Sequence, residues 1–189
     1  MLSAYKKFCA SIISFNEEEW LAMENCLKEK TLRKNEHFVK EGETCQRMGF
    51  IAEGSTRLYF VVEGEEVTKD FCFKNSFTGS LASFLSRQPS SFHVVAMEDT
   101  KLFTFDYPSL MDLYERYSCW NTFGRKMTEQ FAIRKENREV FLLLYSPEER
   151  YAQLMEQFPY ILQRVPLKLI ASYMGVSPET LSRIRKKTS

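Results

Sequence analysis

The chain has 189 residues, of which 44% are hydrophobic and 27% are charged, and its formal net charge is +1. This composition excludes a disordered or low-complexity chain and provides enough apolar side chains for one large domain or two small ones. The charge is unevenly distributed, because residues 159–189 carry six basic side chains and one acidic side chain, Glu179. A basic C-terminal segment on a nearly neutral body indicates that any polyanionic partner binds at that end.

The five cysteines lie at positions 9, 26, 45, 72 and 119, and no two of them form a C-x-x-C pair. Their spacing predicts reduced thiols rather than a disulfide framework, a zinc site or an iron–sulfur cluster. No apolar stretch reaches the ~18 residues that a membrane-spanning helix requires. We therefore expect a soluble, cytoplasmic protein that has no membrane partner and no metal site.

The first elements in chain order are a helix and a series of short strands. Asn16 is a suitable N-cap for a helix whose first turn, Glu17–Glu19, is acidic. Between about residues 30 and 106, short apolar runs alternate with glycine-containing turns, and the two runs on either side of Gly64 are typical of a β-hairpin. This pattern predicts an antiparallel β-sandwich or β-barrel.

A long helix is predicted after the strands. Residues 117–145 contain no proline, and Gly124 is their only glycine, so roughly 28 residues can form a helix about 40 Å long. Apolar side chains recur along it at steps of three and four residues: Trp120, Phe123, Met127 and Phe131. A small β-domain cannot cover a stripe of this length, so we expect the stripe to pack against the same helix of a second chain. The alternative is a helix that packs along its own β-domain.

A second domain is predicted to begin near residue 146. Ser146 is a typical N-cap, Pro147 suits the first helical position, and the acidic pair Glu148–Glu149 completes the first turn. We therefore divide the chain into a β-domain with flanking helices (residues 1–116), a dimerisation helix (117–145) and a helical domain (146–189).

The C-terminal segment contains two helices that are joined by a tight turn. Pro166 precedes the first helix, Gly175 tolerates the left-handed backbone of the turn, and Ser177 caps the second helix. This is the pattern of a helix-turn-helix, whose second helix can lie in the major groove of DNA. The side chains left for DNA are Ser177, Glu179, Thr180, Ser182, Arg183, Arg185, Lys186 and Lys187. The alternative is a capped helical hairpin whose basic face is only solvated.

The segment Ala171–Arg183 resembles the helix-turn-helix of the Crp–Fnr (catabolite activator) family of bacterial transcription regulators, and the order of the predicted elements is similar as well. The resemblance implies an α+β chain with an antiparallel β-roll of the cyclic-nucleotide-binding type, a long dimerisation helix and a C-terminal winged-helix or helix-turn-helix domain. It also implies a homodimeric regulator that binds double-stranded DNA, responds to a small effector and contacts RNA polymerase. It assigns base contacts to Glu179 and Arg183, while Pro178 stands where the family has a further base-contacting arginine.

The resemblance places an effector pocket in the β-roll, at the segments Phe77–Ala82 and Pro89–Ala96. The pocket residues are Gly79, Ser80, Leu81, Ala82, Ser90 and Ser91. The family holds a cyclic nucleotide with a glutamate on its ribose and an arginine on its phosphate, and here Ser80 and Ser90 replace them. Loss of the charge-assisted contact costs about 1.5–3 kcal/mol, so we expect no tight binding of cyclic AMP. Arg87 could replace the arginine only after its loop is rearranged, and the effector stays unidentified.

The sequence lacks the residues that other functions would require. His37 and His93 are isolated in the sequence, which argues against haem ligation and against the metal site of a cupin enzyme. The sequence contains no nucleophile elbow, phosphate-binding loop or dinucleotide-binding motif, so we predict no catalytic residues and no enzymatic activity. The alternative function is a ligand-binding or protein-interaction module whose helix-turn-helix no longer recognises DNA.

Overall fold

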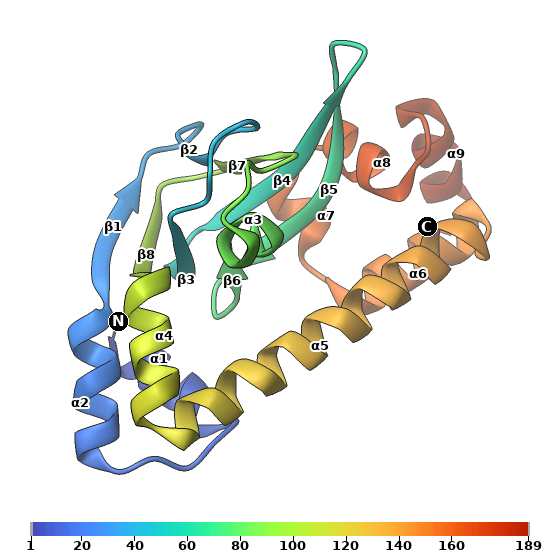
Figure 1. Ribbon diagram of the computed structural model, residues 1–189. Coiled ribbons are helices and arrows are strands. Elements are labelled where there is room, and N and C mark those ends of the chain that lie inside the picture. The colour runs from blue at the N-terminus through green and yellow to red at the C-terminus, as the bar shows by residue number, and fades with distance from the viewer. Residues whose placement is uncertain (1, 189) are drawn as a thin grey trace. The chain divides into compact units, whose positions relative to one another are not determined.

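The computed structural model describes residues 2–188. The internal contacts divide the chain into two compact units, and the division falls after Thr128. The long helix α5 (Ser118–Leu143) runs through this division (Figure 1). The predicted borders after residues 116 and 145 lie close to the start and the end of α5, and the three-part division of the chain stays a prediction. No helix within residues 2–188 is long and apolar enough to cross a membrane.

Two four-stranded antiparallel sheets form the centre of the first unit (Figure 1). One sheet has the strand order β1 (Lys28–Leu32), β8 (Thr100–Asp106), β3 (Arg47–Glu53) and β6 (Phe77–Thr78). The other has the order β2 (His37–Val39), β7 (His93–Ala96), β4 (Ser55–Val62) and β5 (Glu65–Phe73). Buried apolar side chains from both sheets, such as Ile51, Leu58 and Leu102, form one core. The predicted antiparallel β-domain is confirmed.

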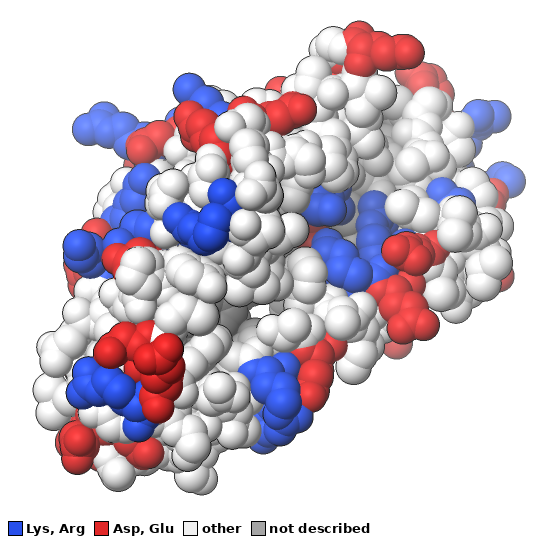
Figure 2. Space-filling view, viewed as in Figure 1, with Lys and Arg blue, Asp and Glu red and all other residues white. Residues whose placement is uncertain are grey.

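The hairpin predicted around Gly64 joins β4 and β5. Val62 pairs with Glu65, so the turn consists of Glu63 and Gly64, whose φ angles are +53° and +84°. Two consecutive positive φ angles are typical of a type I′ turn, whose twist matches that of the flanking strands. The tip of the hairpin is acidic (Figure 2), because Glu63, Glu65 and Glu66 are exposed.

Helices pack against one end of the β-roll: α1 (Leu2–Ala10), α2 (Glu17–Cys26), α4 (Tyr107–Arg116) and the start of α5. The predicted cap of α2 is present, because Asn16 Oδ1 accepts a hydrogen bond from Glu19 N at 2.9 Å. Glu19 Oε2 accepts one in return from Asn16 N at 2.7 Å. This capping box satisfies two backbone N–H groups that the helix itself cannot pair. Asp106 caps α4 by accepting from Ser109 N at 3.1 Å.

The first part of the apolar stripe on α5 is buried within its own chain. Trp120 is 0% exposed and Phe123 is 5% exposed. The Trp120 ring lies 5.4 Å from the ring of Phe15, and its Nε1 donates to Glu19 O at 2.9 Å. The Phe123 ring lies 6.4 Å from that of Phe8. The prediction that Trp120 and Phe123 face a second chain is therefore wrong, because the N-terminal helices and the turn between them cover both rings.

Gly124 allows α5 to approach α4 closely. A Cβ atom at this position would lie 2.0 Å from the hydroxyl oxygen of Tyr114, so a larger residue requires that side chain to move. Further along the stripe, Met127 is half-buried against the same core, whereas Phe131 is 41% exposed. Burial within the chain thus decreases along the predicted dimer stripe.

The second unit contains the end of α5 and four further helices: α6 (Pro147–Gln157), α7 (Ile161–Arg164), α8 (Leu167–Met174) and α9 (Pro178–Thr188). The predicted helix start at Ser146 is a second capping box, in which Ser146 Oγ accepts from Glu149 N at 3.3 Å. Arg150 joins separate elements by donating to Tyr145 O and Met174 O, each at 2.9 Å. The buried apolar core includes Phe141, Leu154, Ile161, Ile170, Met174, Leu181 and Ile184.

Candidate nucleic-acid interface and effector pocket

The turn between α8 and α9 is fixed by a glycine. Gly175 has a φ of +68°, and Val176 N donates to Ala171 O at 3.0 Å. This hydrogen bond is typical of a Schellman motif, in which a residue without a Cβ atom adopts the left-handed conformation at low cost. Ala171 is fully buried where the two helices meet. Local backbone chemistry therefore sets the geometry of the predicted helix-turn-helix.

The predicted DNA-contacting side chains lie on the outer side of α9, the helix that we call the recognition helix. Its inner side is anchored by Leu181 and Ile184, which are 0% and 2% exposed. The exposed side chains are Ser177, Glu179, Ser182, Arg183, Lys186 and Lys187, and the half-buried ones are Thr180 and Arg185. The structure thus brings the predicted residues together on one solvent-facing surface.

Hydrogen bonds order the first two turns of the recognition helix. Ser177 Oγ accepts from Thr180 N at 3.2 Å, and Arg183 Nη2 donates to Thr180 Oγ1 at 3.1 Å. The backbone N–H of Glu179 and then the Ser177 hydroxyl lower the pKa of the Glu179 carboxyl, so this group is ionised at neutral pH. The helix therefore presents a carboxylate and a guanidinium near its start and further positive charge near its end.

The first segment of the predicted effector pocket lies where α3 (Leu81–Ser86) begins. Gly79 has a φ of +136°, and a Cβ atom there would lie 2.7 Å from Met48 Sδ, so the position requires glycine. Ser80 is the N-cap of α3 and is 1% exposed, but its side chain makes no capping hydrogen bond. Leu81 is half-buried and Ala82 is exposed.

The second segment of the pocket is held by hydrogen bonds within the chain. Ser90 is 3% exposed; its Oγ donates to Phe92 O at 2.8 Å and accepts from Phe92 N at 3.3 Å. Its backbone oxygen accepts from Gly42 N at 2.8 Å, and its backbone nitrogen donates to Glu43 O at 2.9 Å. Ser91 is exposed. Neither Ser80 nor Ser90 can supply the charge that a phosphate ester requires.

Arg87 has partners of its own. It ends α3 with a left-handed φ of +60°, and its guanidinium donates to Phe84 O at 3.1 Å and to Gln46 Oε1. The same guanidinium lies 5.2 Å from the centroid of the Tyr107 ring. Arg87 would have to leave all of these contacts to take the place of the missing phosphate-binding arginine.

One polar cluster was not evident in the sequence. His37 and His93 lie with their ring centroids 5.5 Å apart, next to Tyr59. The expectation that the two histidines are isolated is therefore wrong, because β2 and β7 pair and bring them onto one sheet. Among the described residues, no group of three or more His, Cys, Asp or Glu side chains could hold a metal ion.

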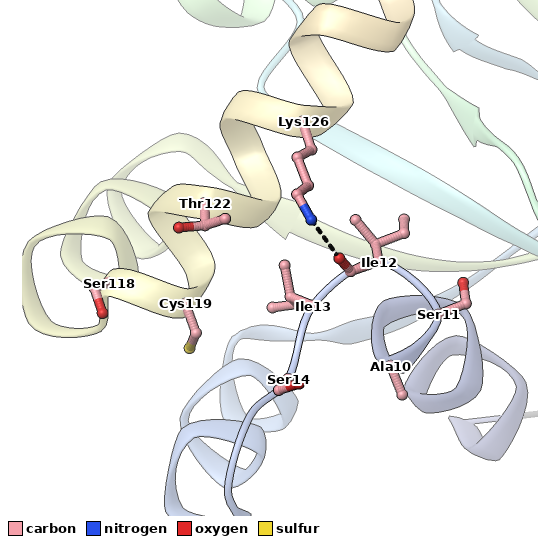
Figure 3. A pocket seen from close by; sticks show the side chains of 9 residues that line it. All are labelled: Ala10, Ser11, Ile12, Ile13, Ser14, Ser118, Cys119, Thr122 and Lys126. Atoms are coloured by element: carbon pink, nitrogen blue, oxygen red, sulfur yellow. Dashed lines mark hydrogen bonds between the residues drawn. The ribbon is translucent and has the colours of Figure 1, made fainter.

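A hollow of about 390 Å³ lies beside the end of α1 and the first turns of α5 (Figure 3). Its lining is mostly polar, and Lys126 is the charged side chain that points into it (Figure 3). Lys126 Nζ donates to Ile12 O at 2.8 Å and so ties α5 to the end of α1. Burial, followed by the nearby Glu19, raises the pKa of the Cys119 thiol in the lining to about 11. This thiol is therefore protonated at neutral pH and is a poor nucleophile.

Comparison with known proteins agrees with this geometry. Residues 29–117 match the cyclic nucleotide-binding domain family. No curated protein sequence matches the chain. The matched residues run from β1 to the end of α4, so they include both sheets of the first unit.

Several solved structures have a fold similar to that of this chain. The chain is similar to FixK2 from Bradyrhizobium japonicum, with a TM-score of 0.74, 18% identity, and coverage of 85% of this chain and 83% of FixK2. It is similar to the Thermus thermophilus catabolite activator protein, with a TM-score of 0.58, 22% identity, and coverage of 92% and 84%. For the c-di-GMP responsive regulator CLP of Xanthomonas campestris, the TM-score is 0.70, the identity 12%, and the coverage 92% and 91%. The chain has the Crp–Fnr fold, and the resemblance inferred from its sequence is confirmed at this level.

Proposed function

We propose that the chain is a transcription regulator that binds double-stranded DNA as a homodimer and responds to a small effector in its β-roll. The observation that carries the proposal is the recognition helix, whose inner face is buried and whose ordered outer face presents Glu179 and Arg183. The proteins of similar fold include regulators of gene expression, which supports a regulatory role rather than an enzymatic one. We place this activity in the cytoplasm, with RNA polymerase as the predicted further partner.

The chemistry of the recognition helix divides into two parts. Near its start, a carboxylate such as Glu179 can accept from cytosine N4, and the guanidinium of Arg183 can donate to guanine O6 and N7. Near its end, Lys186 and Lys187 are suited to phosphate oxygens, which position the protein without specifying the sequence. Base recognition is therefore assigned to the first two turns, and sequence-independent affinity to the last.

The surface that we assign to dimerisation lies on the second half of α5 and on Leu144, the residue that follows its end. Ile133, Asn137, Val140 and Leu144 follow one another at steps of four, three and four residues. Ile133 is 59% exposed and Leu144 is 75% exposed, so both offer apolar surface to a second copy. This spacing is that of a two-stranded coiled coil, in which one polar residue at the seam fixes register. We call these four residues the α5 seam, and we propose it as the dimer interface in place of the predicted stripe of Trp120, Phe123, Met127 and Phe131.

The test is selection of bound sequences from a random DNA duplex library, with and without a panel of metabolites. We expect a two-fold symmetric site, because a symmetric dimer places two recognition helices about one helical turn of DNA apart. Affinity for that site should fall steeply with salt, because phosphate contacts release counterions. If no duplex binds more tightly than scrambled DNA at any salt concentration, the protein-interaction alternative takes the place of this proposal.

A further inference from the structure

The two histidines of the chain lie close together on one sheet. That sheet contains β2, β7 and β4 (Figure 1). His37 lies on β2, His93 lies on β7, and Tyr59 of β4 pairs with His93 across the sheet. The rings of Tyr59 and His93 are stacked, with centroids 4.8 Å apart and an interplanar angle of 16°. The His37 ring lies 5.5 Å from that of His93 and approaches it edge-on.

Hydrogen bonds connect this cluster to the backbone. His37 Nε2 lies 2.9 Å from the Tyr59 hydroxyl oxygen. Glu41 N donates to His93 Nδ1 at 3.3 Å, and His93 Nε2 lies 3.5 Å from Glu41 Oε2. Because Nδ1 accepts this bond, it carries no proton, and the proton of a neutral His93 is on Nε2, facing the carboxylate.

The cluster is next to the hydrogen bonds that hold the second segment of the effector pocket, Pro89–Ala96, which we call the effector segment. Glu41 is in the turn that follows β2, and the neighbouring Gly42 N donates to Ser90 O at 2.8 Å. Ser90 N donates to Glu43 O of the same turn at 2.9 Å. His93 begins the strand that this effector segment enters. The contact between His93 and Glu41 therefore fastens the same two segments that these backbone hydrogen bonds join.

Charged groups surround the cluster on every packed element. The positive ones are Lys40 and Arg57, and the negative ones are Glu41, Glu43 and Glu66. The Arg57 guanidinium lies 4.2 Å from the centroid of the Tyr59 ring, and it pairs with Glu66. Burial, followed by His93 and Lys40, lowers the pKa of His37, and the carboxylates of Glu43 and Glu66 oppose this effect only in part.

We propose that His37, His93 and Tyr59 form an acid-sensitive clasp that fastens the turn after β2 to the segment Pro89–Ala96 and opens when the His37 imidazole takes up a proton. Protonated His37 can no longer accept from the Tyr59 hydroxyl, and its positive charge lies near Lys40. The open state binds protons more readily than the closed state, so it gains population as the pH falls below about 6.5. Its consequence for regulation rests on the proposed function: the opened segment holds the effector less firmly.

The clasp can be tested without DNA, so its failure is distinct from failure of the proposed function. The chain has two histidines, so an NMR titration between pH 5 and 8 follows the two imidazoles without overlap. Amide hydrogen exchange, corrected for the intrinsic effect of pH, reports opening at Gly42 and Ser90. We expect protection of both amides to fall about tenfold as His37 takes up its proton, while amides of the β1–β8 pair stay protected.

Three variants distinguish opening of the clasp from a general effect of low pH on amide protection. His37→Gln combined with His93→Gln should remove the pH dependence at Gly42 and Ser90. His93→Gln alone should raise the pKa of His37, because a neighbouring positive charge is lost. Should the double variant not fold, Tyr59→Phe keeps the stacked ring and removes the hydroxyl, and the pKa of His37 should change. Equal loss of protection in the wild type and the double variant, or a His37 pKa unaffected by His93→Gln, would overturn the proposal.

Discussion

The effector segments and the recognition helix differ in where their polar groups point. In the effector segments, Ser80 and Ser90 are buried, and the Ser90 hydroxyl is hydrogen-bonded to Phe92 of the same chain. In the recognition helix, Glu179 and Arg183 are exposed and charged. A family fold can therefore keep two binding regions in place while only one of them retains the charges that an anionic ligand requires. The difference supports the proposed DNA binding more than it supports binding of a cyclic nucleotide.

The two halves of α5 also differ, in this case in how exposed their apolar side chains are. Trp120 and Phe123 are covered by the N-terminal helices, whereas Ile133 and Leu144 are exposed. α5 thus supplies core packing at its start, and its second half together with Leu144 presents an exposed apolar surface.

The largest effect is expected when this open surface is made charged. Ile133→Asp combined with Leu144→Asp should convert the dimer to a monomer, because each chain would bury two carboxylates at the α5 seam. A monomer loses the avidity of two linked half-sites, so affinity for the selected site should fall by about 100-fold or more. Sedimentation at micromolar concentration and fluorescence anisotropy measure the two effects.

Phe131→Asp is the matched control, because Phe131 is exposed on the same helix but lies outside the α5 seam. We expect this variant to remain dimeric. A monomeric Phe131→Asp variant together with a dimeric seam variant would restore the original stripe as the dimer surface.

A smaller effect is expected from Arg183, the arginine that we propose to contact a base. Arg183→Ala should cost about 1–3 kcal/mol per half-site and relax preference at one base position, because it removes a bidentate contact with guanine. Ser182→Ala is the control on the neighbouring exposed position, and it should change affinity little. If Arg183→Ala weakens binding to the selected site and to scrambled duplex equally, Arg183 contacts phosphate instead.

The basic residues at the end of the recognition helix should act on all sequences alike. Lys186→Ala and Lys187→Ala should each reduce the slope of log affinity against log salt by about one unit. Lys187 Nζ lies 3.8 Å from Glu148 Oε1, and both side chains are largely exposed, so this ion pair should compete only weakly with a phosphate. Anisotropy titrations at several salt concentrations, with selected and scrambled duplexes, measure the slope; an unchanged slope would remove these lysines from the interface.

Features set by local sequence could be predicted, and features set by distant contacts could not. The capping box at Asn16, the turn at Gly64 and the helix start at Ser146 each depend on a few neighbouring residues. The cover over Trp120 depends on segments about a hundred residues earlier in the chain, as its hydrogen bond to Glu19 shows.

The histidine cluster depends in the same way on the order of strands in a sheet. His37 and His93 meet because β7 lies between β2 and β4, which no local pattern reveals. Family resemblance locates the two segments of the effector pocket, but the hydrogen bonds between Ser90 and Phe92 become evident only in the folded structure.

The smallest expected effect is that of cyclic AMP on the wild-type protein. Ligand at a hundredfold excess over its Kd would raise the free energy of unfolding by about 2.7 kcal/mol. We expect no measurable thermal shift at micromolar cyclic AMP, because Ser80 and Ser90 provide neither the acid nor the base that would hold it. The double variant Ser80→Glu, Ser90→Arg restores both charges. Cyclic AMP should raise its melting temperature if the absence of these charges is what prevents binding. A clear shift in the wild type would instead implicate Arg87, and it should then disappear in Arg87→Ala, since that guanidinium would have had to leave Phe84 and Gln46 to reach the phosphate.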